Sequence, residues 1–409
     1  LKEKYSKTLN NSKNSSKIKQ SLAKNNNSID TQLKQYLKEE KFDIAEKRAR
    51  KLLIKKPKSS FLHNYLGVCL ANQKRFDEAL KSLKTSRDLD PNAKDAIFNE
   101  ALIHLRFGDL KKGWDLYEAG LGDNIMREIA SKDYFSEAKE IWDGEPFKGT
   151  LLVYGEQGIG DQLMFGTVLD DLLKIQPNIG LIVDGRLKGL FQRTYPQIQV
   201  FSITEEKSLF EYDKIITLGS LCRFFRNDLK SFNNGKIKIY RTSLEKDYQV
   251  RSLFPRVNGL KIGVSWLSFA DKNASKRSLS SKEISSIIDS GNHTFINLQY
   301  GKIKENLEEI NNLSNNQIHK IPGIDVTYNI DGLASIINNC DLVITIDNST
   351  AHLAACLGKP VWIILPYINE FRWMDNTETS YWYDNVLLLR QGKNKKWNKI
   401  IDNVSYSLK

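Results

Sequence analysis

The chain has 409 residues, of which 40% are hydrophobic and 27% are charged. These fractions are typical of a globular protein and exclude a largely disordered chain, and the length allows two or three compact units. Lys and Arg outnumber Asp and Glu by 61 to 49, a net charge of +12. The excess is spread thinly and forms no sustained basic helix, so we expect no nucleic-acid partner.

The cysteines and the apolar runs indicate in which cellular compartment we expect the protein. No apolar run is long enough to span a bilayer, so we expect no transmembrane segment. The polar stretch that follows Leu1 does not resemble a secretory signal. A disulfide framework or zinc cluster is not indicated, because the four cysteines are widely separated within apolar segments: Cys69, Cys222, Cys340 and Cys356. Together these features predict a cytoplasmic protein.

The first 120 residues divide into a tail and a repeat. Residues 1–30 are rich in Asn, Ser and Lys and predict a disordered polar tail. Three pairs of like residues then follow at a spacing of 34: Phe42 and Phe76, Ala45 and Ala79, and Pro57 and Pro91. This is the period of tetratricopeptide repeats, whose pattern the stretch LHNYLGVCLANQKRFDEALKSLKTSRDLDP resembles.

We therefore expect tetratricopeptide repeats over residues 31–120, followed by a linker or docking helices over 121–148. About two and a half repeats fit in this space, which is short for a free-standing array. The groove of such an array binds a peptide or a partner helix, and a structural spacer is the alternative role.

From residue 149 onward, short apolar runs alternate with helical patterns. This alternation predicts two Rossmann-like α/β domains with a cleft between them, over residues 149–250 and 259–409. The runs that we expect to form buried parallel strands lie at 151–156, 180–185, 199–202, 214–219, 261–266, 294–300, 342–347 and 361–366. Ligands of open α/β sheets bind beyond the carboxyl ends of the strands, so the residues after each run are the informative ones.

A glycine-rich turn follows the first run. The stretch GEQGIGDQ (155–162) precedes a helical pattern, so Gly158 and Gly160 would allow a ligand to approach the backbone at a helix N-terminus. Asp161 would lie in the first helical turn, where its alternative role is to complement the helix dipole. The stretch is not a dinucleotide fingerprint, because a third glycine would be needed at Leu163.

A dense polar segment follows the run at 342–347. Asp347, Asn348, Ser349 and Thr350 offer capping oxygens and backbone amides at the start of a short helix, which suits a diphosphate. His352 lies in the first turns of that helix and could donate to a phosphate or a sugar hydroxyl. A packed structural histidine is the alternative.

Two further segments follow strands in the second domain. The loop SFADKNASKRS (268–278) carries Lys276 and Arg277, which could neutralise a departing diphosphate, although an exposed charged loop is the alternative. Aromatic residues crowd 371–373 and 381–383. For these we favour core and interdomain packing over stacking on a base or sugar.

Several of these segments together resemble the heptosyltransferase-like (family 9-like) branch of the glycosyltransferases, in bacterial proteins where tetratricopeptide repeats precede the catalytic region. The resemblance covers residues 32–400 and is carried by EQGIGDQLMF, WLSFADKNASKRS, INLQYG, DLVITIDNSTAHLAACLGKPVWIILP, FRW and SYWYDNVLLLRQ. The sequence departs from the family where Leu267 and Ser268 follow Trp266, since a Gly-Asn pair is common there.

The resemblance implies a GT-B fold whose first α/β domain takes the acceptor and whose second takes the nucleotide sugar. It implies metal-independent transfer with no cofactor, and Asp161 as the base toward the acceptor hydroxyl. The nucleotide-sugar-binding residues that follow from the motifs and the resemblance are Gly158, Gly160, Gln162, Trp266, Lys276, Arg277, Gln299, Asp347, Asn348, Ser349, Thr350 and His352.

The sequence thus predicts a glycosyltransferase that moves a sugar from a nucleotide-sugar donor to a hydroxyl by inverting displacement, with a protein acceptor bound through the repeats. The alternatives are a non-catalytic adaptor with a degenerate transferase region, or a transferase acting on a lipid-linked glycan. A dehydrogenase or epimerase would need a complete dinucleotide fingerprint and a ribose-binding acid, neither of which is evident.

Overall fold

The computed structural model describes residues 31–121, 127, 140–205, 211–232, 239–256, 258–269, 274–375 and 377–409. The predicted tail and most of the predicted linker lie outside these residues. The chain divides into two compact units, one up to Glu100 and one from Ala101 onward.

The first unit is helical. Residues 31–38 are helical. The helices that follow are α2 (Phe42–Lys55), α3 (Ser60–Ala71), α4 (Phe76–Leu89) and the start of α5 (Lys94–Arg106). The helix α4 begins 34 residues after α2, and α5 begins 34 residues after α3. A Cβ at Gly67 would lie 2.6 Å from Cγ of Leu83, so the approach of α3 to α4 requires a glycine there. The predicted helical repeat is confirmed.

The second unit opens with α6 (Leu110–Tyr117) and then builds a small sheet. Its four parallel strands have the order β3-β2-β1-β4. They are β1 (Leu151–Tyr154), β2 (Ile179–Val183), β3 (Gln199–Ser202) and β4 (Lys214–Thr217). The helices of this domain are α8 (Ile159–Phe165), α9 (Leu169–Ile175), α10 (Lys188–Thr194) and α11 (Cys222–Phe225). Buried strands that read as continuous apolar runs are typical of parallel sheets.

A larger parallel sheet follows, with the order β10-β9-β8-β5-β6-β7. Its strands are β5 (Lys261–Ser265), β6 (Thr294–Asn297), β7 (Ile318–His319), β8 (Leu342–Ile346), β9 (Val361–Leu365) and β10 (Val386–Arg390). All eight predicted strands are present. The two that were not predicted are β7, which has only two residues, and β10, an edge strand in which Leu387 is exposed.

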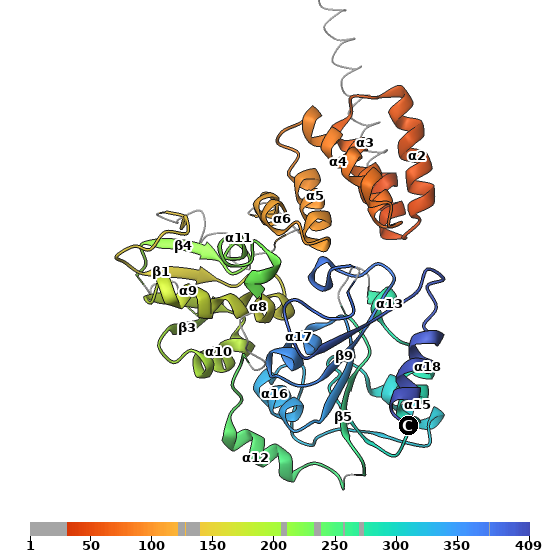
Figure 1. Cartoon of the computed structure of the whole chain (residues 1–409). Coiled ribbons are helices and arrows are strands. Elements are labelled where there is room, and N and C mark those ends of the chain that lie inside the picture. The colour runs from red at the N-terminus through yellow and green to blue at the C-terminus, as the bar shows by residue number, and fades with distance from the viewer. Residues whose placement is uncertain are drawn as a thin grey trace, which may run out of the picture. The chain divides into compact units, whose positions relative to one another are not determined.

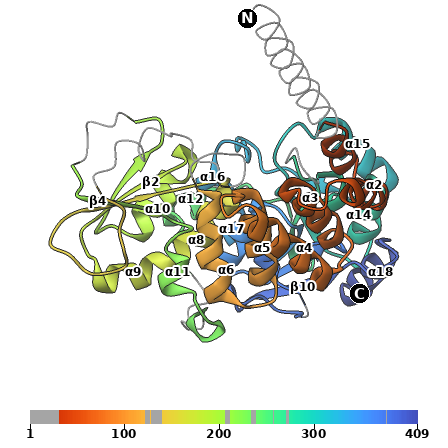
Figure 2. The same ribbon diagram turned by 90° about the horizontal axis from the view of Figure 1, so that it is seen from above.

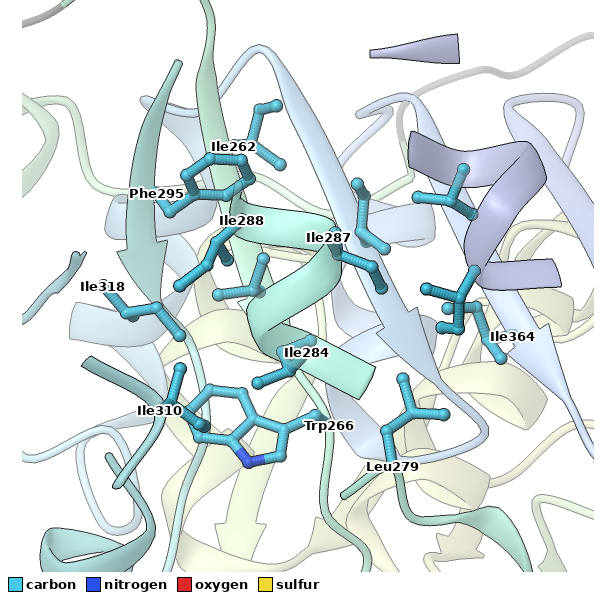
Figure 3. Packing of buried hydrophobic residues seen from close by; sticks show 14 of the residues in the cluster. Ile262, Trp266, Leu279, Ile284, Ile287, Ile288, Phe295, Ile310, Ile318 and Ile364 are labelled. Carbon is cyan, nitrogen blue, oxygen red and sulfur yellow. The ribbon is translucent and has the colours of Figure 1, made fainter. Parts of the chain in front are cut away.

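Helices cover both faces of the larger sheet (Figure 1). On one face lie α14 (Ser281–Ile288), α15 (Lys304–Leu313) and α18 (Asn398–Ser407), and on the other lie α16 (Ile330–Asn338) and α17 (Ser349–Cys356). The helix α14 starts at a capping box in which Ser280 and Glu283 satisfy each other's backbone amides. Figure 3 shows the resulting core, where Trp266 packs near Ile284 and Ile310.

A helix from the end of the first α/β domain packs against the second. In α12 (Leu244–Ser252), Oδ2 of Asp247 accepts a hydrogen bond of 2.7 Å from Nδ2 of Asn338 in α16. The predicted architecture, in which two parallel-sheet α/β domains follow a helical segment along the chain, is confirmed.

The strand orders place a topological switch point in each sheet. The chain leaves β1 toward β2 on one side, and β4 then pairs on the other side of β1. In the larger sheet the chain runs from β5 outward to β7 and returns to β8 on the opposite side of β5. Open α/β sheets bind ligands at such points, at the carboxyl ends of the strands. The loops after β1, β5 and β8 are therefore the candidate site.

Candidate active site

The loop after β1 and the start of α8 lie against the start of α17. A Cβ at Gly160 would lie 3.0 Å from Cδ2 of His352 and 3.4 Å from Cα of Ser349. A side chain at residue 160 would therefore press on His352, so the glycine favours this close approach of α8 and α17. The structure thus brings the two predicted polar segments together, although nearly 200 residues separate them in the sequence.

Asp161 forms an ion pair with a residue of the other α/β domain. Nε of Arg372 donates to Oδ1 of Asp161 at 2.6 Å, and Nη2 of Arg372 contacts the same oxygen. Arg372 follows β9, and its Nη2 also donates to Oε1 of Gln157 at 3.3 Å. The carboxylate in the first turn of α8 is therefore held in part by a cation of the second domain.

Burial raises the pKa of the Asp161 carboxyl, and this is the largest influence on it. The guanidinium of Arg372 opposes that shift, and so does a backbone hydrogen bond from Gly158. A carboxylate whose basicity is raised by burial is suited to accept a proton from a hydroxyl. The ion pair keeps the charged form available at neutral pH.

Asp347 at the end of β8 is buried and receives two side chains. Its Oδ1 accepts a 2.7 Å hydrogen bond from Nε1 of Trp373, and its Oδ2 lies 3.4 Å from Nη1 of Arg277. Since Arg372 contacts Asp161 and Trp373 contacts Asp347, two consecutive residues connect the two carboxylates. This connection lies at the switch points of both sheets.

Asn348 caps α17. Its Oδ1 accepts from the backbone amides of Thr350 at 3.0 Å and Ala351 at 3.4 Å, and its Nδ2 donates to Oγ of Ser265 at 2.8 Å. The side chain of Ser349 bonds to the Tyr300 hydroxyl. These contacts fix the start of α17 relative to β5, so the positive end of the helix has a defined position.

His352 is buried and uncharged at neutral pH. Burial is the main cause that lowers its pKa to about 3, and the nearby guanidinium of Arg372 adds to the effect. Its Nδ1 lies 2.9 Å from the hydroxyl of Tyr383, and its ring stacks on Trp373 with centroids 4.7 Å apart. A neutral imidazole held in this way can offer a hydrogen bond but not a charge.

Three of the predicted binding residues are used inside the fold. Oε1 of Gln299 accepts from the backbone amides of Trp266 at 2.7 Å and Leu267 at 2.6 Å, while the Trp266 ring is fully buried. Oε1 of Gln162 accepts from the amide of Asp184 at 2.8 Å. These side chains hold the strand ends in place rather than reach outward from them.

The remaining predicted residues, with the exception of Lys276, lie near the starts of α8 and α17. Lys276 and Arg277 belong to the short helix α13 (Ala274–Arg277), and Gly158 is the N-cap of α8. Among the predicted residues, those brought together at the start of α8 and α17 are Gly158, Gly160, Asp161, Arg277, Asp347, Asn348, Ser349, Thr350 and His352.

Arg372, Trp373 and Tyr383 were not predicted as site residues, because the aromatic segments that contain them were interpreted as packing. The position of Arg372 offered a signal: it follows the carboxyl end of β9 within a polar and aromatic loop. A cation at that place is as informative as the residues after β1 and β8.

Residues 60–93 match the family described as tetratricopeptide repeat. A curated relative, Protein FlbA of Caulobacter vibrioides, is 25% identical over 339 residues, which cover 76% of this chain and 54% of the relative. The chain therefore spans about half the length of the curated relative that it matches.

Two solved structures are similar at low identity. The glycosyl transferase family 9 protein from Veillonella parvula is 13% identical, with a TM-score of 0.48 over 63% of this chain and 92% of that one. The iron-containing dodecameric glycosyltransferase TibC from enterotoxigenic E. coli is 14% identical, with a TM-score of 0.39 over 65% of this chain and 78% of that one.

Two further features concern the described part of the chain. None of its helices combines the length and the apolar character that crossing a membrane requires. Within the same residues, no three His, Cys, Asp or Glu side chains gather as metal ligands would.

Proposed function

We propose that this chain transfers a sugar from a nucleotide-sugar donor to an acceptor hydroxyl. The observation that carries the proposal is the pairing of Asp161 with Arg372 beside the Asp347–Trp373 contact, at the switch points of two parallel sheets. The resemblance of the surrounding motifs to heptosyltransferase-like enzymes supports the same activity.

In the reaction, the acceptor oxygen attacks the anomeric carbon while the bond from that carbon to the diphosphate breaks. Asp161 takes the proton of the acceptor hydroxyl as general base. The negative charge that develops on the leaving diphosphate is stabilised by Lys276, Arg277 and the positive end of α17. Attack and departure on opposite faces of the sugar invert the anomeric centre.

The transfer that we propose needs no metal ion. Lys276 and Arg277 supply positive charge where metal-dependent transferases place a cation. The distant structural neighbour TibC is described as iron-containing, so the expectation needs a direct test with chelators of both magnesium-type and iron ions.

We propose a protein acceptor, bound through the helical repeats of the first unit. A match to the tetratricopeptide repeat over residues 60–93 supports a protein-binding role for this unit. A lipid-linked glycan is the alternative acceptor. Transfer of radiolabelled sugar to trichloroacetic-acid-precipitable, protease-sensitive material from the native host would favour protein, whereas label in the organic extract would favour lipid.

The experiment that tests the activity is titration calorimetry against a panel of nucleotide sugars, with ADP-heptose, UDP-glucose, UDP-N-acetylglucosamine and GDP-mannose as probes. We expect one of them to bind and to release its nucleoside diphosphate when host lysate supplies the acceptor. An inert adaptor would bind none of the four and would release no diphosphate. A dehydrogenase would instead bind a nicotinamide cofactor.

A further inference from the structure

The helix that ends the repeat region sends a side chain to the loop that carries Asp161. Tyr117 is the last residue of α6, and its side chain is buried. The Tyr117 hydroxyl accepts a 2.5 Å hydrogen bond from Nε2 of Gln157, which lies four residues before Asp161. In Figure 2, α6 lies in front of α8. The ring centroids of Trp114 in α6 and Phe165 in α8 are 6.2 Å apart, in an edge-to-face contact.

The amide of Gln157 has one possible orientation in these surroundings. Arg372 can only donate, so the atom of Gln157 that faces its Nη2 at 3.3 Å must be the carbonyl oxygen. The amide nitrogen then faces the Tyr117 hydroxyl, with a longer contact of 3.4 Å to Oε1 of Glu156. The amide therefore connects Tyr117 to Arg372.

Gln157 also adopts a backbone conformation that side chains rarely favour. Its φ is +59°, in the left-handed region. Such a conformation persists when the surroundings hold it. Here the contacts of the side chain with Tyr117 and Arg372 hold it.

The Tyr117 hydroxyl has a rigid setting. Its ring makes edge contacts with Trp114 at 5.3 Å and a tilted contact with Phe371 at 5.9 Å. The guanidinium of Arg127 lies over the same ring, 4.5 Å from its centre, and forms a buried ion pair with Glu156. The hydroxyl cannot turn away from Gln157 without moving this cluster.

We propose that Tyr117 is a positioning residue for the transfer reaction, acting through Gln157 and Arg372 on Asp161. The connected atoms are Oη of Tyr117, the amide of Gln157, the guanidinium of Arg372 and Oδ1 of Asp161. This inference rests on the proposed function, because it gives the helical segment a role only if Asp161 is the base. The helix α6 then contributes to catalysis by positioning Asp161.

The test is Tyr117→Phe, which keeps the ring and removes the hydroxyl. We measure kcat, KM and their pH dependence from nucleoside diphosphate release, using the nucleotide sugar from the panel that the wild type turns over. We expect kcat to fall about tenfold, as for the loss of one oriented hydrogen bond, with KM for the donor unchanged. The acid limb of kcat should move to higher pH, because a loosened Arg372 opposes the effect of burial on Asp161 less.

A second variant removes the Gln157 amide, which connects Tyr117 to Arg372. Gln157→Gly removes the amide but tolerates the positive φ, so it should lower kcat and shift the acid limb as Tyr117→Phe does. The double variant should be no worse than the worse single variant. Tyr406→Phe is the matched control, because that side chain is 82% exposed and lies in α18.

Either of two results overturns the inference. One is a wild-type kcat and acid limb in Tyr117→Phe, and the other is fully additive losses in the double variant. If the wild type turns over no donor, the proposed function fails, and hydrogen exchange then tests the link alone. Faster exchange over residues 155–165 in Tyr117→Phe than in Tyr406→Phe would support the link, and equal exchange would overturn it.

Discussion

The loops after β1 and β8 use their side chains in opposite ways. After β1, Gln157 and Asp161 reach outside their own domain and contact Tyr117 and Arg372. After β8, the side chain of Asn348 caps its own helix and holds β5. The carboxylate of the first loop is held from another domain, whereas the second loop is held within its own.

This difference shows how the two domains divide the chemistry. Contacts within the second domain fix the N-terminal end of α17. Arg372 of the same domain contacts Asp161, a carboxylate of the first domain. The base that we propose, Asp161, is therefore coupled to the domain that we propose binds the donor. A change on either side of the ion pair should alter the reaction in a distinct way, which gives the following predictions.

The largest effect is expected for Asp161→Asn. The amide cannot accept the acceptor proton, so kcat should fall by about a thousandfold or more. Binding of the donor, measured by calorimetry, should change little, because we propose that the donor is held mainly by the second domain. Turnover within tenfold of the wild type would contradict the assignment of Asp161 as the base.

A smaller effect is expected for Arg372→Met. Without the guanidinium, the effect of burial on Asp161 is opposed less, so its pKa should rise further and the acid limb of kcat should move to higher pH. We expect kcat at neutral pH to fall about tenfold to a hundredfold.

The control for this variant is Arg223→Met, which removes an arginine from a more exposed pair with Asp115. It should leave the pH profile unchanged. If the acid limb of kcat does not move in Arg372→Met, Arg372 does not control the ionisation of the proposed base, Asp161.

The lowered pKa of His352 predicts that the free energy of unfolding, rather than the rate of transfer, depends on pH. Its pKa is about 3 in the folded chain and about 6.5 unfolded. Between these values the unfolded chain binds the proton and the folded chain does not. The free energy of unfolding should therefore fall as pH decreases from 6.5, by at most about 1.4 kcal/mol per pH unit from this group.

The measurement compares urea unfolding of the wild type and His352→Asn from pH 7.5 to 5. Both share the other titrating groups, so the difference in slope belongs to His352. We expect a shallower slope in the variant. Parallel curves would show that His352 titrates in the folded chain as it does in water.

The smallest effect is expected for metal removal. Incubation of the active wild type with excess EDTA, and separately with an iron chelator, should leave kcat unchanged within error. A loss of activity that iron or magnesium restores would contradict the metal-independent reaction, while leaving the role of Asp161 to be tested separately.

Local patterns predicted the framework of this fold well. The 34-residue spacing of Phe42 and Phe76 marks the starts of α2 and α4, and continuous apolar runs marked every long buried strand. The strand β10 was not predicted, although Val386 to Leu389 form an apolar run, and the structure places it at the edge of the sheet beside β9. Periodicity is a property of neighbouring residues, so it predicts elements that form by local pattern and burial.

Partners across the site could not be predicted in the same way. Arg372 lies 211 residues from Asp161, and no spacing rule connects them. Conversely, Trp266 and Gln299 stand at strand ends where ligand contacts are expected, but their side chains complete the core and hold the backbone. Position at the end of a strand identifies the place of a site, while the direction of each side chain depends on packing.

The most direct test of the account is a structure of Asp161→Asn with the nucleotide sugar identified by the panel. We predict that the diphosphate lies at the start of α17 near Arg277, with the anomeric carbon directed toward residue 161. A diphosphate bound elsewhere, or a sugar directed away from residue 161, would contradict the proposal that these two loops form one active site.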